Sequence, residues 1–108
     1  MKITTFNRLK KKANQLTNNF LLKAKNKMVV EMTKRAKDGD IELAAMYASD
    51  LADIMYVCYA IKNGNYIEAH KHWWDMDTDP RDMFPNTLTD ILDRLSDYEQ
   101  DNNAELED

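Results

Sequence analysis

The segment HWWDMDTDPRDMF, residues 72–84, holds the densest set of side chains that could bind a metal or a partner. Three aspartates in it have the alternate spacing with which an EF-hand loop begins to coordinate calcium: Asp75, Asp77 and Asp79. Such a loop needs glycine at its sixth position and glutamate at its twelfth, where this sequence has Pro80 and Asn86. Because the fixed φ angle of proline forbids the sharp turn, we do not expect calcium to bind there.

The histidines and the cysteine are poor candidates for metal binding or catalysis. His70 and His72 are two positions apart, so on a helix they point about 200° apart around its axis. Glu68 lies four positions before His72, but the helical Glu-x-x-His ligand pair needs histidine at 71, which is Lys71. Cys58 lies in an apolar run without a neighbouring histidine or cation. With no phosphate loop or nucleophile motif either, we expect a protein that is not an enzyme and has no metal or cofactor.

Trp73 and Trp74 are the side chains of this segment best suited to bind another protein. Adjacent residues on a helix point to different sides, so we expect one indole to enter the core with Tyr66 and Ala69. The other indole either packs in the core as well or lies at the edge, where an exposed aromatic ring serves as an interface anchor. We interpret the segment as a corner between helices with an acidic edge, and both tryptophans are candidate partner-binding residues.

Charge divides the chain into two parts. The formal net charge of the 108 residues is −4. Residues 1–37 hold eleven Lys or Arg and one acid, which gives +10, whereas residues 38–108 hold four cations and eighteen acids, which gives −14. This asymmetry predicts either a charged partner or pairing between the two parts. The cationic residues that we expect to contact a partner are Arg8, Lys10, Lys11, Lys12, Lys23, Lys27, Lys34 and Arg35.

The basic segment is predicted to be one long helix. Its apolar residues recur every three or four positions from Phe6 to Ala36, and no glycine or proline occurs before Gly39. Such a helix would be about 45–50 Å long at 1.5 Å per residue. A small core cannot cover that length, so part of the helix is expected to project or bend. A break is expected at Thr17–Asn19, because these side chains compete for backbone hydrogen bonds.

Two glycine turns are predicted to end the first and second helices. Gly39 and Gly64 can adopt the left-handed conformation that terminates a helix. Asp40 and Asn65 are expected to cap the helices that follow, with Glu68 completing a capping box.

The second helix, at about 41–62, is predicted to be the central and most buried one. Its expected polar stripe is Glu42, Ser49, Asp50 and Asp53. Its small residues would admit a neighbouring helix closely, and they are Ala44, Ala45, Ala48 and Ala52.

The rest of the chain completes an all-α fold. A short third helix is expected at 66–75, and a connector at 77–85, because proline disfavours helix at the residue before it. A fourth helix, capped by Asn86 or Thr87, would bury the face Leu88, Ile91, Leu92, Leu95 and Tyr98. The prediction is an irregular bundle of about four helices in one domain, residues 1–98, followed by a flexible acidic tail, residues 99–108.

The turn regions resemble a known helical repeat. The stretch YAIKNGNYIEAHKHW, residues 59–73, is similar to the helix–turn–helix of the tetratricopeptide repeat. A second stretch, RAKDGDIELA, residues 35–44, shows a weaker similarity to it. The two glycines are 25 positions apart, whereas that repeat spans 34. We therefore interpret both turns as αα-hairpins built by the same physics. The resemblance implies a peptide- or protein-binding role and carries over no binding residue.

These features favour a small non-enzymatic binding or regulatory protein that acts through protein–protein contacts. An acidic protein surface would complement the basic helix. The composition suits a phage or bacterial accessory factor that inhibits or adapts a host machine. The alternative is a nucleic-acid-binding protein that uses the basic helix, although its few arginines and aromatics argue against this function.

Two further expectations concern location and assembly. No run approaches the ~20 apolar residues of a membrane span, and a lone cysteine suits a reducing compartment, so we expect a cytoplasmic protein without membrane contact. The sequence leaves homo-oligomer formation open.

Overall fold

The computed structural model describes residues 2–107, with the side chains of residues 2–78 and 80–101. Its helices are α1 (Ile3–Lys37), α2 (Ile41–Lys62), α3 (Tyr66–Asp75), the single turn α4 (Thr78–Arg81) and α5 (Asn86–Glu107). Residues 2–107 form no β-strand. The predicted all-α class with about four main helices is confirmed.

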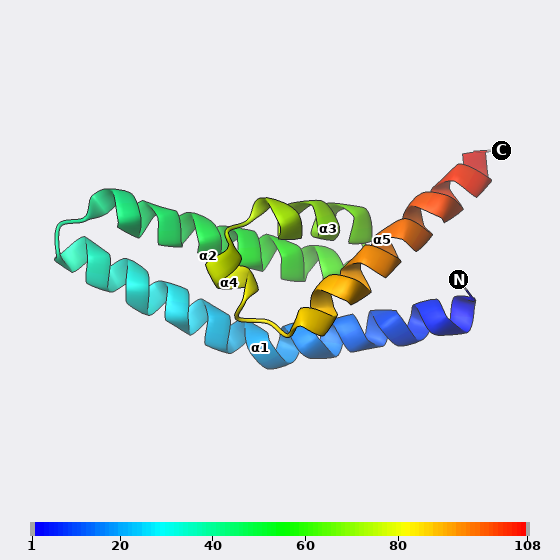
Figure 1. Cartoon of the computed structure of the whole chain (residues 1–108), viewed down its shortest axis with the longest axis horizontal. Helices are drawn as coiled ribbons and strands as arrows, with labels where there is room; N and C mark the ends of the chain where they lie inside the picture. The colour runs from blue at the N-terminus through cyan, green and yellow to red at the C-terminus, as the bar shows by residue number, and fades with distance from the viewer. Residues whose placement is uncertain (1, 108) are drawn as a thin grey trace.

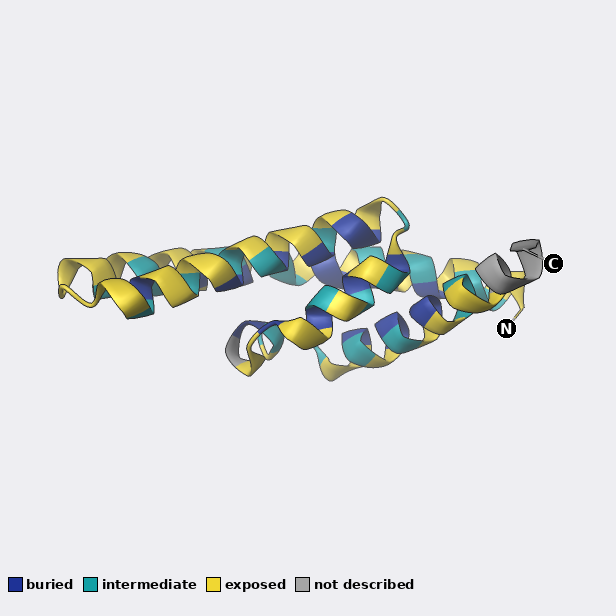
Figure 2. Cartoon of the chain, turned by 90° about the horizontal axis from the view of Figure 1, so that it is seen from above, coloured by how far each residue is buried: buried dark blue, intermediate teal, exposed yellow. Residues whose placement is uncertain are grey.

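The long helices make the molecule elongated, with extents of 55 × 26 × 19 Å. Helices α1 and α2 form an antiparallel hairpin, α3 packs along α2, and α5 packs against α3 and α1 (Figure 1). The hairpin extends well beyond α3 and α5, and we call its end, residues 29–49, the arm (Figure 1). All residues of the arm are described, and Ala44 alone among them is buried, so the arm is mostly exposed (Figure 2). The first helix therefore projects from the core, as its length predicted.

Helix α1 runs without interruption through the predicted break at Thr17–Asn19, so that prediction was wrong. The hydroxyl of Thr17 is buried and donates hydrogen bonds to the carbonyls of Ala13 and Asn14, both at 3.0 Å. The side chain thus bonds within its own helix and does not terminate it. Such bonds to the preceding turn often bend a helix, and α1 bends near its middle (Figure 1).

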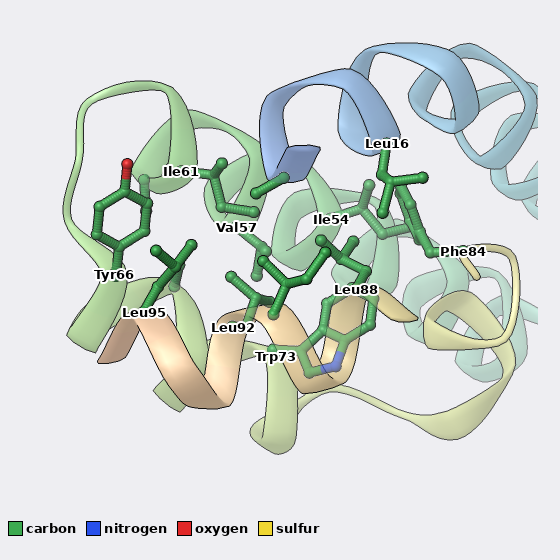
Figure 3. Close-up of a cluster of buried hydrophobic side chains, with 14 of the residues drawn as sticks. Leu16, Ile54, Val57, Ile61, Tyr66, Trp73, Phe84, Leu88, Leu92 and Leu95 are labelled. Carbon is green, nitrogen blue, oxygen red and sulfur yellow. The ribbon is translucent and has the colours of Figure 1, made fainter. Parts of the chain in front are cut away.

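The hydrophobic core lies where α2, α3 and α5 meet the first part of α1. Trp73, on α3, is 1% exposed, and Tyr66 and Ala69 are buried with it, as predicted. The Trp73 ring contacts the Phe84 ring edge to face at 5.6 Å, and its Nε1 donates to the hydroxyl of Thr89 at 3.0 Å. The predicted apolar face of the last helix is confirmed, because its leucines point into this cluster: Leu88, Leu92 and Leu95 (Figure 3).

Helix α2 is central, as predicted, because it contacts α1, α3 and α4, but it is less buried than its nearly continuous apolar sequence predicted. It exposes five large apolar side chains: Ile41, Met46, Met55, Tyr56 and Tyr59. Asp50, predicted to lie on a polar stripe, is only 6% exposed. The reason is that α1 lies against one side of α2 and α3 packs near its C-terminal half only.

The two predicted glycine turns are present. Gly39 and Gly64 have φ angles of +83° and +77°, where a Cβ atom would be strained. Asp40 caps α2 as predicted, because its carboxylate accepts a hydrogen bond from the Leu43 amide at 3.2 Å.

The N-terminus of α3 is capped from another helix. Asn65 makes no side-chain cap, and Glu68 lies instead 3.9 Å from His72, so the predicted capping box was wrong. The Ile67 amide donates to a carboxylate oxygen of Glu99, on α5, at 2.8 Å. Burial of the Tyr66 side chain raises its pKa, and the nearby charge of Glu99 raises it further. Glu99 thus belongs to the folded body, although the predicted flexible tail begins there.

Two predictions for the connector between α3 and α5 were also wrong. Pro80 lies inside α4, where the first turn of a helix tolerates proline, so the segment 77–85 is not wholly irregular. Helix α5 already includes Asn86 and Thr87, neither of which precedes it as a cap.

Replacing Glu99 with alanine is expected to lower the free energy of unfolding by about 1–2 kcal/mol, the usual loss for a removed N-terminal cap. Urea denaturation followed by circular dichroism would measure it. Asp97→Ala removes an equal charge from an exposed site on α5 and is expected to change stability by less than about 0.5 kcal/mol. Equal effects of the two substitutions would contradict the assigned cap.

Candidate functional site

Five of the predicted partner-binding cations lie along one side of α1. They succeed one another at intervals of four, eleven, four and seven residues, close to whole turns of a helix, and they are Arg8, Lys12, Lys23, Lys27 and Lys34. All five are exposed. We call this set the basic stripe. It spans most of α1 and ends on the arm.

The other three predicted cations are placed differently. Lys10 is half-buried, with its Nζ 5.5 Å from the centre of the Phe6 ring. Phe6 in turn stacks on Tyr98 of α5, at 4.1 Å between ring centres. Lys11 is exposed but lies off the stripe. Arg35 is half-buried and 3.9 Å from Glu31, one turn earlier on α1. These three are less suited to act together with the stripe.

Within the described residues, no carboxylate forms an ion pair with a cation of the basic stripe. Among the side chains of residues 2–78 and 80–101, Arg35 is the one cation of α1 within ion-pair distance of a carboxylate. Lys27 faces a hollow that it lines together with Glu31, Tyr47 and Asp82, yet it forms no ion pair with either of these described acids. The internal pairing that the divided charge allowed is therefore not seen in the described part of the chain.

An apolar hollow adjoins the stripe where it reaches the arm. Val29 and Val30 are 42% and 61% exposed, and with Lys34 and Lys37 they line a hollow of about 430 Å³. The two valines were not among the predicted partner-binding residues. A signal was present, because both fall outside the three-to-four-residue apolar repeat that runs from Phe6 to Ala36.

Of the two candidate tryptophans, only Trp74 is accessible. Trp73 is 1% exposed and fills the core, so its prediction as a partner-binding residue is corrected, whereas Trp74 is 51% exposed. The guanidinium of Arg81 lies 4.8 Å from the Trp74 ring centre. Trp74 and Arg81 also line a hollow of about 310 Å³ together with Asp90 of α5.

Polar contacts with α5 hold the Trp74 ring in place. Its Nε1 lies 3.1 Å from His70 Nε2 and 3.3 Å from Asp93 Oδ1. His70 Nε2 is itself 2.5 Å from the same Asp93 oxygen, a separation that requires a proton between them. His70 therefore donates to Asp93, and the indole has Asp93 as its acceptor. An aromatic ring held in this way loses little conformational entropy on binding a partner.

Cys58 and the histidines are not arranged as a reaction centre. Burial raises the pKa of the Cys58 thiol from 9.0 to about 11, so it is a poor nucleophile at neutral pH. His72 packs against Tyr56, with ring centres 4.1 Å apart. Among the described side chains, no three His, Cys, Asp or Glu residues lie close enough together to hold a metal ion. The side chain of Asp79 lies outside the described residues, so only Asp75 and Asp77 of the aspartate triplet are described.

Comparison of the chain with protein-family models, with curated proteins and with solved structures finds no match. Within the described residues, no helix combines the length and the apolar character that crossing a membrane requires.

Proposed function

We propose that this chain is a small non-enzymatic binding protein, and that the basic stripe of α1 docks on an acidic surface of a protein partner. The observation that carries the proposal is the basic stripe lying beside the exposed apolar hollow of the arm. The size and composition suit an accessory factor of a phage or a bacterium that inhibits or adapts a host machine.

The electrostatic part of the proposal rests on the cations of the stripe, which are exposed and form no ion pair with an acid of the described residues. Complementary charge accelerates association and orients the two partners, but adds limited affinity at an exposed surface. Affinity then requires apolar contact, which Val29 and Val30 supply at the end of the stripe. A fitting partner segment carries several acids and one or two aliphatic side chains.

The arm's shape also supports this function. It projects from the core and exposes both sides of the hairpin, so a partner can approach it without meeting α3 or α5 (Figures 1 and 2). Trp74 lies on α3, outside the arm. We assign Trp74 a second, separate contact and give the main contact to the stripe and the hollow.

Nucleic-acid binding is the alternative. Lysines alone can neutralise phosphates. However, the stripe contains one arginine, and the adjoining hollow is lined by valines rather than by aromatic rings on which bases stack. The protein partner is therefore the better explanation of the apolar hollow.

The test reverses the charge of the stripe and compares capture of a partner from the native host. The variant Lys23→Glu/Lys27→Glu/Lys34→Glu is expected to weaken binding of the captured protein about a hundredfold, because like charges across an interface repel strongly. Val30→Asp alone is expected to weaken it about tenfold or more. Calorimetry with the purified partner would measure both losses.

The matched control is Lys62→Glu/Lys71→Glu/Arg94→Glu, which makes the same charge change at exposed sites outside α1. It is expected to bind like the unaltered chain, and equal loss in both triple variants would refute the assigned surface. The unaltered chain is also titrated with generic DNA and RNA at low salt. Binding that declines steeply with salt and is lost in the stripe variant would establish the nucleic-acid alternative instead.

A further inference from the structure

The outer side of α2 carries an apolar seam that no part of the described chain covers. Its positions advance by four, three, four, three and four residues and are Ile41, Ala45, Ala48, Ala52, Met55 and Tyr59. All six are exposed, and none carries a charge. This is the spacing with which one helix meets another in a coiled coil. It differs from the side that faces α1, where Ile54, Val57 and Ile61 are buried.

The seam lies between two sides of α2 that are already packed. On one side a groove of about 250 Å³ separates Met55 and Tyr59 from Asn18 and Lys25 of α1. On the other side Tyr56 contacts His72 of α3. A further helix can therefore lie on the seam without displacing either neighbour.

The order of side chains along the seam is self-complementary for antiparallel pairing. With a two-fold axis at position 50, Ile41 of one copy lies opposite Tyr59 of the other, Ala45 opposite Met55, and Ala48 opposite Ala52. The two alanine pairs then let the helices approach closely at the axis, and each Met55 faces an alanine, while Ile41 contacts Tyr59 at both ends. Parallel pairing would instead set Met55 against Met55 and Ala45 against Ala45, and the helices would be unevenly spaced. A two-fold contact of this kind closes after two copies.

The exposed area is sufficient for a weak dimer. Ile41 and Tyr59 are 66% and 68% exposed, and Met55 is 49% exposed. With the three alanines, the seam offers on the order of 500 Å² per copy, so a pair would bury roughly 1,000 Å², the lower limit of a specific interface. Burial of this apolar area from water is the driving force.

We propose that a second copy of this chain occupies the seam, and that the protein forms a reversible antiparallel dimer through α2. The dimer leaves the basic stripe of α1 outside the contact, because the stripe lies on the other helix of the hairpin. The proposal is independent of the function proposed above, since it needs no other partner. Each dimer would present two stripes.

Sedimentation velocity of the full chain between about 1 and 300 µM tests the proposal. A dimer with a Kd on the order of tens of micromolar is expected from an interface at the lower size limit. Ala48→Glu places two carboxylates beside the two-fold axis, and it is expected to raise the Kd at least a hundredfold. Glutamate is a good helix former at this exposed site, so the circular dichroism spectrum should be unchanged. Met46→Glu, on α2 but off the seam, is the matched control and should dimerise normally.

Cross-linking with a short bismaleimide tests the register, in a Cys58→Ser background. A mixture of Ala45→Cys and Met55→Cys chains is expected to form a covalent dimer efficiently, whereas Ala45→Cys alone is not. A chain that stays monomeric to 300 µM would overturn the proposal, as would a dimer insensitive to Ala48→Glu. Efficient cross-linking of Ala45→Cys to itself would overturn the antiparallel arrangement.

Discussion

Replacing Trp73 with alanine is expected to lower the free energy of unfolding by about 3–5 kcal/mol, the range for removing a large aromatic side chain from a packed core. The ring is 1% exposed, contacts Phe84 edge to face and donates a hydrogen bond to Thr89. Alanine would leave a cavity between α3 and α5 and an unpaired hydroxyl at Thr89. Since small domains are stable by only about 5–15 kcal/mol, this substitution would remove a large share of the total.

The adjacent residue provides the control for this substitution. Trp74→Ala removes a ring of the same size that is 51% exposed. The contacts that it loses, with Arg81 and Asp93, lie at the surface. We therefore expect the free energy of unfolding to change by less than about 1 kcal/mol. Urea denaturation monitored by circular dichroism measures both variants without relying on the tryptophan signal. A loss for Trp73→Ala no larger than that for Trp74→Ala would contradict the assigned core.

Amide hydrogens of the arm, residues 29–49, are expected to exchange with solvent at least about a hundredfold faster than those of the core segments of α2 and α5. Exchange follows local opening, and opening is easier where few apolar side chains are buried. Ala44 is the one buried residue of the arm, whereas Ile54, Val57 and Ile61 follow further along α2, and Leu88, Leu92 and Leu95 lie on α5. The arm can thus open while the rest of the fold stays intact.

Hydrogen exchange measured by mass spectrometry at about 1 µM tests this, because the proposed dimer would be mostly dissociated at that concentration. Equal protection in the arm and in the core would contradict it. Exchange repeated at a few hundred micromolar is expected to slow along the seam, with the arm portion of α1 unchanged. The two concentrations separate the intrinsic stability of the arm from the effect of a second copy.

The features of the candidate site that depend only on residues close together in the sequence were predictable. The regular spacing of the cations on a helix of known period is sufficient to align Arg8, Lys12, Lys23, Lys27 and Lys34 on one side. The division of Trp73 and Trp74 between two sides of α3 follows equally from helical geometry. Which of the two is buried depends on where α5 lies, and sequence periodicity does not contain that information.

The sequence by itself determined the helices and their ends. Its apolar repeat is sufficient for the last helix to bury Leu88, Leu92 and Leu95, and positive φ angles at Gly39 and Gly64 end α1 and α2 in the turns expected. These are short-range effects, because helix formation and termination depend on residues within about four positions of one another.

The tertiary structure alone decided which apolar surfaces are covered. The apolar residues of α2 predicted a buried helix, yet Ile41, Met55 and Tyr59 remain exposed, because α1 and α3 pack on its other sides. Glu99 caps α3 from 32 residues away along the chain. Burial and such long-range hydrogen bonds depend on which helices lie side by side, and that arrangement is set by apolar contacts between distant segments rather than within any one segment.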